Sequence, residues 1–217
     1  MFKQSSGQDT QKSALLSPPP CKGLRALDFV YQLNDRCLEL LSNMASEKQA
    51  DSPLALVHQH RALWQRLEPE ARARAARLPF MLVDVHFTDA PWWREVREPG
   101  CPSEPETPTS FPKATAEPLI TETLMLAWYV AQSEPSVAPL MVGMSRPVAE
   151  IIGALTTHQV HDIALRHPQS IRPRWAHVPD LWGALLIAAQ RNDDHALAEI
   201  HAHAQLRFVG ELLSGFH

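Results

Sequence analysis

Three polar side chains in the C-terminal part of the chain have the spacing of metal ligands. His158, His161 and Asp162 are separated by three and four residues, so a helix would place them on one face. Imidazole and carboxylate groups bind zinc, but a complete site needs further ligands. These would have to come from another predicted helix, which carries His195, His201 and His203. Because the last two would point in very different directions, we favour titrating surface histidines and predict no metal.

Arginines in two parts of the chain could bind phosphate. Arg172 and Arg174 flank Pro173 in a segment that we expect to be extended, where residues i and i+2 point to the same side. Arg166, at the end of the preceding predicted helix, could join them on the backbone of DNA. Three arginines would add a modest, salt-dependent contact. The alternative is a solvated strand edge.

A second group of arginines lies in the N-terminal half. Residues 60–97 contain seven arginines and five acidic residues, and Arg72, Arg74 and Arg77 share one predicted helix. Arg74 and Arg77 are three residues apart and would lie on one face. This is the best anion-binding patch that the sequence offers, and its alternative is an exposed helix face.

Catalytic motifs are absent from the sequence. It has no Gly-x-Ser-x-Gly, no phosphate-binding P-loop and no His-Glu-x-x-His, and its 8 glycines leave few nucleotide-binding loops. We therefore expect a protein that is not an enzyme and that uses no cofactor. A His-ligated metalloenzyme is the last of the alternatives.

Composition limits the partners. The chain has 217 residues, 45% of them hydrophobic, which predicts a globular protein. Its net charge of −4 does not indicate nucleic-acid binding, so any such role would need a local basic patch or a basic partner. No apolar run could span a membrane, and the polar N-terminus lacks a secretion signal. Three widely spaced cysteines suggest reduced thiols, so we expect a cytoplasmic location.

Prolines and apolar periodicity divide the chain. We expect a disordered tail over residues 1–23, a helical region over 24–97, a Pro-rich linker over 98–118 and a helical domain over 119–217. Thr156 and Gln159 form a predicted capping box at the start of a helix. Only residues 80–87 and 169–175 are predicted to be extended. The predicted fold class is all-α, with two small helical regions joined by the linker.

The two regions share a pattern at an offset of 88 residues. Leu67 corresponds to Leu155, Ala76 to Ala164, Phe87 to Trp175 and Pro91 to Pro179, and two tryptophans, Trp93 and Trp182, follow one position out of register. The pattern fits either an internal duplication or the rhythm that any two helical segments share. A duplication would make the fold a pseudo-dimer within one chain.

Residues 124–175 contain a series of short motifs distributed over three predicted helices and an extended segment. They are Ala127, Val142-Gly143-Met144, Ala154-Leu155-Thr156, Gln159, Ile163-Ala164 and Pro173-Arg174-Trp175. In these motifs the stretch resembles FlhD, the non-enzymatic subunit of the FlhD–FlhC regulator of flagellar transcription. Ile171 stands where that family often has a cysteine able to bridge subunits.

The resemblance implies a regulatory subunit, which we expect to act as a partner-dependent activator. An FlhC-like protein would supply most of the contact with promoter DNA, and the chain could also associate with itself. The alternative is an adaptor or anti-regulator that does not touch DNA. We expect the interface with a second copy or a partner to include large aromatic side chains, namely Trp128, Trp175, Trp182 and Phe208.

Overall fold

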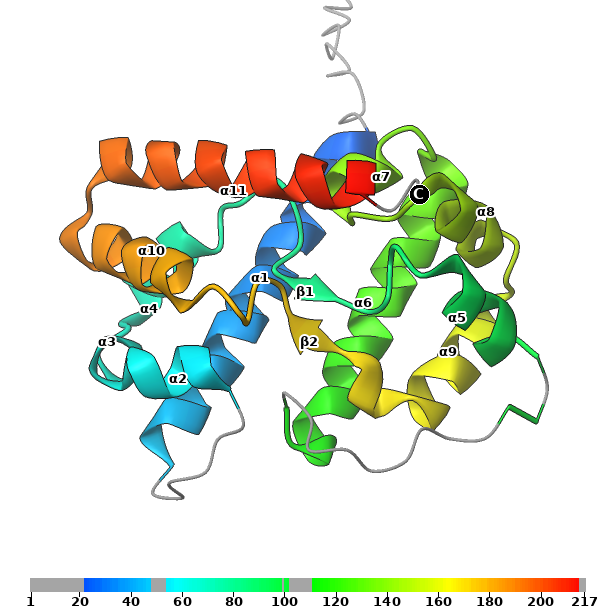
Figure 1. Ribbon diagram of the computed structural model, residues 1–217, viewed down its shortest axis with the longest axis horizontal. Helices are drawn as coiled ribbons and strands as arrows, with labels where there is room; N and C mark the ends of the chain where they lie inside the picture. The colour runs from blue at the N-terminus through cyan, green and yellow to red at the C-terminus, as the bar shows by residue number, and fades with distance from the viewer. Residues whose placement is uncertain (1–21, 48–53, 99, 102–110, 215–217) are drawn as a thin grey trace, which may run out of the picture.

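The computed structural model describes residues 22–47, 54–98, 100–101 and 111–214. The fold is almost entirely helical, as predicted, and two short strands pair near the centre (Figure 1). The predicted tail, apart from Lys22 and Gly23 at the start of the first helix, and the middle of the predicted linker lie outside the described residues.

The N-terminal half contains a long helix followed by short ones. Its elements are α1 (Lys22–Ser46), α2 (Ala55–Gln59), α3 (Arg61–Gln65), α4 (Pro69–Ala75), β1 (Val83–Asp84) and α5 (Ala90–Val96). Pro69 occupies the first turn of α4 and Glu70 adds an acidic side chain there, both of which favour a helix start. At α5, Asp89 accepts a hydrogen bond from the backbone N–H of Trp92, at 3.0 Å.

The C-terminal half repeats this order and adds a final helix. Its elements are α6 (Lys113–Ser133), α7 (Ala138–Met141), α8 (Arg146–Gly153), α9 (Thr157–Arg166), the 3₁₀ turn η1 (Pro168–Ser170), β2 (Arg172–Pro173), α10 (Pro179–Arg191) and α11 (Asp194–Ser214). The capping box predicted at Thr156 and Gln159 is present at the start of α9. Asp193 caps α11 by accepting the backbone N–H of Ala196.

The predicted linker is shorter at its C-terminal end than the prolines suggested. Helix α6 begins at Lys113 and continues through Pro118, although a proline inside a helix removes one backbone hydrogen bond. Ala116, Leu119 and Ile120 are fully buried around it. Their burial offsets the lost hydrogen bond and keeps this turn helical.

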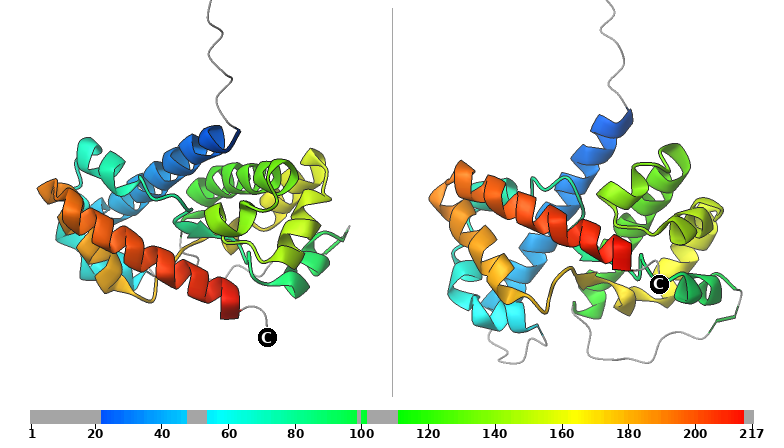
Figure 2. Two further views of the ribbon diagram at one scale, coloured as in Figure 1. Left: turned by 90° about the horizontal axis from the view of Figure 1, so that it is seen from above. Right: turned by 45° about the horizontal axis from the view of Figure 1, so that its top comes forward.

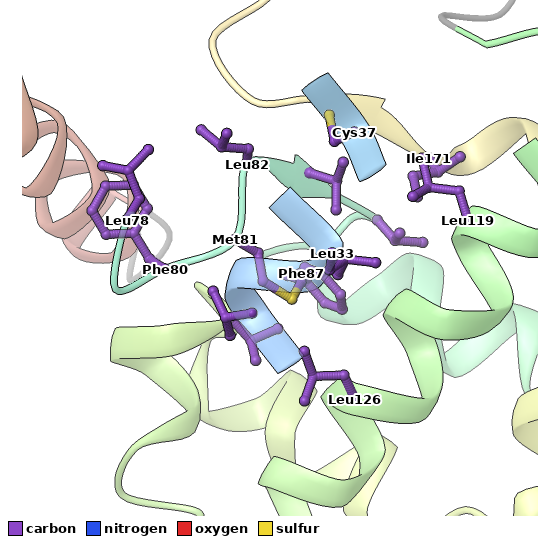
Figure 3. Packing of buried hydrophobic residues seen from close by; sticks show 14 of the residues in the cluster. Leu33, Cys37, Leu78, Phe80, Met81, Leu82, Phe87, Leu119, Leu126 and Ile171 are labelled. Atoms are coloured by element: carbon purple, nitrogen blue, oxygen red, sulfur yellow. The ribbon is translucent and has the colours of Figure 1, made fainter. Parts of the chain in front are cut away.

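The strand pair lies near α1 and α6, at the centre of the molecule (Figure 1). β1 and β2 are antiparallel, with Val83 opposite Pro173 and Asp84 opposite Arg172. Asn34 of α1 fixes the segment before β1, because its amide nitrogen donates to the carbonyl of Phe80 at 2.9 Å and its oxygen accepts the N–H of Leu82 at 2.8 Å. Figure 3 shows the surrounding side chains, among them Leu33, Cys37, Leu78, Phe80, Met81, Leu82, Phe87, Leu119, Leu126 and Ile171.

The two halves exchange the helices that follow their strands. α10 crosses to pack on α2, α3 and α4 of the N-terminal half, while α5 packs on α8 of the C-terminal half. Trp182 of α10 meets Trp64 of α3 with ring centres 5.9 Å apart. A single hydrophobic cluster therefore runs through both halves, and the described part of the chain behaves as one packed unit.

The two exchanged segments share two local features. His86 and Trp175 each have a positive φ, of 47° and 51°, directly before the turn into the crossing helix. Trp93 donates its indole N–H to the carbonyl of His86 at 3.0 Å, and Trp182 donates to that of Arg174 at 3.1 Å. The positive-φ residues and the tryptophans are each separated by 89 residues, one more than the offset seen in the sequence, and the two carbonyl acceptors by 88. A duplication stays a prediction.

Candidate functional site

An ionic cluster lies where the strand pair meets α11. The guanidinium of Arg174 is 4% exposed and donates to the carbonyls of Met81, at 3.0 Å, and Val142, at 2.5 Å. It also lies 3.5 Å from a carboxylate oxygen of Asp84 and 3.6 Å from one of Glu211. Arg174 thus joins α11, the strand pair and the turn after α7.

The charges in this cluster compensate one another. Burial by itself raises the pKa of Asp84, but Arg174 and Arg172, which also donates hydrogen bonds to it, hold this pKa below its ordinary value. Burial lowers the pKa of Arg174, while Asp84 and Glu211 favour its charged form. The ring of Phe208 lies 4.8 Å from the same guanidinium. The arrangement fixes the position of α11 and offers no open site.

The structure places the arginines predicted to contact DNA near the strand pair in different environments. Arg174 is enclosed and cannot reach a phosphate, because its donors are used inside the fold; this corrects the prediction for that residue. The side chain of Arg172 is 54% exposed and forms an ion pair with Asp84. Arg166 is mostly buried, and its donors reach Asp162 and the carbonyls of Val96 and Cys101.

The two arginines of α4, Arg72 and Arg74, form contacts within the fold, whereas Arg77 follows the helix. Arg72 forms an ion pair with Asp35 at 2.9 Å, and that hydrogen bond raises its pKa. Arg74 donates twice to the carbonyl of Ala189 near the end of α10, at 2.8 and 3.0 Å, and so holds the crossing helix in place. Arg77 is exposed and forms no ion pair with any described residue. It is the freest of the six arginines predicted to bind DNA.

The histidines do not converge. His158 and His161 are exposed on α9, and Asp162 beside them is bound by Arg166. On α11, His195 lies 3.8 Å from Glu199, His203 accepts from Arg207, and His201 faces inward, where burial lowers its pKa. Within the described ranges, no three His, Cys, Asp or Glu side chains form a metal-binding group. Cys37 is likewise buried in the core, which raises its pKa.

The aromatic residues predicted for an interface lie mostly inside the molecule. Trp175, Trp182 and Phe208 are each at most 4% exposed, so they are not available to a separate partner. They join the halves of this chain instead, since Phe208 stacks on Phe80 with ring centres 4.8 Å apart. Trp128 is half-buried and donates its indole N–H to the carbonyl of Leu155 at 2.8 Å.

An apolar surface on α11 was not predicted. The inner side of this helix buries Leu197, Ala204, Phe208 and Leu212. Its outer side exposes a stripe that we call the α11 stripe, composed of Ala202, Leu206, Val209, Gly210 and Leu213. Leu206 is 76% exposed and Leu213 is 62% exposed. A helix that is apolar on two sides is typical of one that packs against two neighbours.

A groove between α1 and α6 is a second surface that sequence reasoning missed. We call it the α1–α6 groove; it is lined by Phe29, Gln32, Leu33, Asp35, Arg36, Glu39, Glu122, Met125, Leu126 and Tyr129. In the left view of Figure 2, α1 and α6 lie in the upper part of the picture and α11 runs across the lower part. The helices that form the groove are therefore separate from the helix that carries the α11 stripe.

Helical spacing could have revealed part of both surfaces. Leu206, Val209 and Leu213 follow the i, i+3, i+7 pattern, but the inner face of the same helix satisfies that pattern too. In the same way, Phe29 is four residues before Leu33 and lies beside the buried stripe of α1. Periodicity identifies apolar faces, and only the packed structure shows which of them stays uncovered.

Comparison with known proteins found no matching family model, no matching curated protein and no matching solved structure. The arrangement of helices in the structure defines an all-α protein. No helix in the described ranges combines the length and the apolar character that crossing a membrane requires.

Proposed function

We propose that the chain is a protein-interaction subunit of a transcription regulator, similar in role to FlhD, that docks on an FlhC-like partner and reaches promoter DNA through it. The observation that carries this proposal is the α11 stripe. Two leucines more than half exposed, in line on an otherwise well-packed helix, favour a partner surface over a free one.

The arginines support the dependence on a partner. Of the six predicted to bind DNA, Arg174 is buried, and Arg72, Arg74, Arg166 and Arg172 are used by contacts within the chain. Arg77 alone is exposed and unpaired among the described residues. With a net charge of −4, the chain has little counterion-release affinity of its own, so a basic partner would have to supply it.

The pairing of β1 with β2 and the exchange of α5 and α10 support a pseudo-dimer. Asp84 pairs with Arg172 and Val83 pairs with Pro173. Every antiparallel pair has such a local two-fold relation, and here its offset is 89 residues. The same number of residues separates His86 from Trp175 and Trp93 from Trp182, which favours a two-fold axis between duplicated halves. We infer that a duplicated module has been joined into one chain, and that the contacts a dimer would make between subunits are made here between its halves.

The experiment that tests the proposal measures partner and DNA binding together. The native complex is purified at low salt, and the Leu206→Asp/Leu213→Asp variant is compared with Gln205→Asp, which also adds acid to an exposed position of α11. We expect the double variant to bind the partner at least about thirtyfold more weakly, since buried anchor residues contribute about 2 kcal/mol or more, and the control to bind normally.

A measurement of DNA binding separates this proposal from the alternative, an adaptor that does not touch DNA. The arginines that are used by contacts within the chain are consistent with both. We expect the chain alone to bind promoter DNA weakly and with strong salt dependence, and the complex to bind much more tightly. Retention of the partner by the double variant would contradict the role of the α11 stripe. If the complex bound DNA no more tightly than the isolated chain, the result would favour the adaptor function instead.

A further inference from the structure

We propose that the α1–α6 groove binds a basic amphipathic helix of a partner protein. This inference rests on the interaction role proposed above but uses a different surface. α1 and α6 pack against each other, and residues of both helices line the groove. The shape and the charge of the α1–α6 groove indicate what it binds.

The floor and walls of the groove are apolar. Leu33 and Leu126 form its floor and are less than 10% exposed, while Met125 and Tyr129 are half-buried at its side. Phe29 is 55% exposed at one end. Large aromatic and methionine side chains around a groove are typical of sites that receive the apolar face of a helix.

The length of the groove fits a short helix. The lining positions of α1 run from Phe29 to Glu39, and ten residues of helix extend about 15 Å. On α6 the lining runs from Glu122 to Tyr129, in the spacing of one helix face. About three turns of a partner helix would therefore cover the α1–α6 groove.

The charges on the rim select a basic occupant. Asp35, Glu39 and Glu122 line the groove, against Arg36 as the single basic residue. Arg36 pairs with Glu122 at 3.0 Å, and Arg72 reaches Asp35 and Glu39 from α4. The side chains of Glu39 and Glu122 remain 49% and 48% exposed, so a lysine or arginine can still reach both. The rim thus keeps an excess of carboxylate even with Arg72 included.

The test uses two labelled peptides of about 14 residues, or about four turns. Both carry leucines at i, i+4 and i+7; one has lysines on the flanks, and the other has glutamates in their place. Fluorescence anisotropy with the full chain gives the dissociation constants. We expect the lysine peptide to bind at least about tenfold more tightly, and to weaken as salt rises from about 50 to about 300 mM.

Variants locate the binding. Phe29→Asp should weaken the lysine peptide about tenfold, as loss of an apolar anchor does, and Glu39→Lys/Glu122→Lys should abolish the preference for lysine over glutamate. Glu199→Lys on α11 is the charge control and should change little. Leu206→Asp/Leu213→Asp should leave peptide binding intact, which separates this surface from the α11 stripe.

Several outcomes would overturn the proposal. Equal binding of the two peptides, no saturable binding of either, or an effect of Glu199→Lys as large as that of Glu39→Lys/Glu122→Lys would each do so. Sedimentation provides an independent check. A dimer of the full chain that Phe29→Asp converts to a monomer would assign the groove to a second copy of this protein instead.

Discussion

At the scale of single residues, Arg174 shows how the same side chain can suggest two opposite roles. Its alternation with Arg172 correctly indicated an extended segment, but not which of the two would be enclosed. Enclosure depends on Met81, Val142 and Glu211, which are remote in sequence and supply the acceptors. Sequence patterns do not contain that information, so the residue looked like a surface cation.

We expect Arg174→Met to lower the free energy of unfolding by about 3 kcal/mol or more, because it leaves Asp84 without its buried partner. Arg172→Ala is the comparison and should cost less, about 1 kcal/mol, because the Arg172 side chain is 54% exposed and Arg174 still compensates Asp84. Urea unfolding followed by tryptophan fluorescence measures both. Equal effects of the two substitutions would show that burial does not increase the contribution of Arg174 to the free energy of unfolding.

The pH dependence of this cluster has a definite sign. The pKa of Asp84 is lower in the folded protein than its ordinary value of 3.8. Its ionised form therefore contributes stability that is fully present above that value and is lost as the pH falls through the lower, folded-state pKa.

At the scale of elements, local signals mark the starts of several helices. The capping box of α9, the prolines in the first turns of α4 and α10, and the Asp193 cap of α11 all act within a few residues. Pro118 misled the prediction, because the gain from burying its neighbours is a tertiary effect. The register of β1 and β2 could not be predicted either, since each strand has only two residues.

The cap of α9 gives a local test. Thr156→Ala removes the hydroxyl that accepts the backbone N–H of Gln159 at 3.2 Å, and should cost about 1 kcal/mol. Thr156→Ser keeps the hydroxyl and should recover most of that stability. Chemical unfolding of the three proteins provides the comparison. If alanine and serine were equally destabilising, the methyl group of Thr156 would matter more than its cap.

At the scale of the whole molecule, the exchange of α5 and α10 makes each half depend on the other. The sequence suggested two helical regions with a repeat, but not that their helices cross over, because nothing local distinguishes packing on one half from packing on the other. Trp182 is 2% exposed, and its ring contact is with Trp64 of the opposite half. Neither half can bury its own apolar surface alone.

Division of the chain within residues 102–110 tests this dependence. We expect neither fragment to unfold cooperatively by itself, since each would expose the surface that the other covers. An equimolar mixture should regain the helical signal in circular dichroism and sediment as one complex. Independent cooperative folding of either fragment would contradict a shared core.

The position of α10 also has a consequence for synthesis on the ribosome. The surface of α2, α3 and α4 that α10 covers is made about a hundred residues before α10 itself. Domains usually fold as the nascent chain emerges, with the N-terminal part first. Here that order cannot be completed, so the growing polypeptide must carry an uncovered apolar surface until α10 has been made, and should attract chaperones throughout that interval.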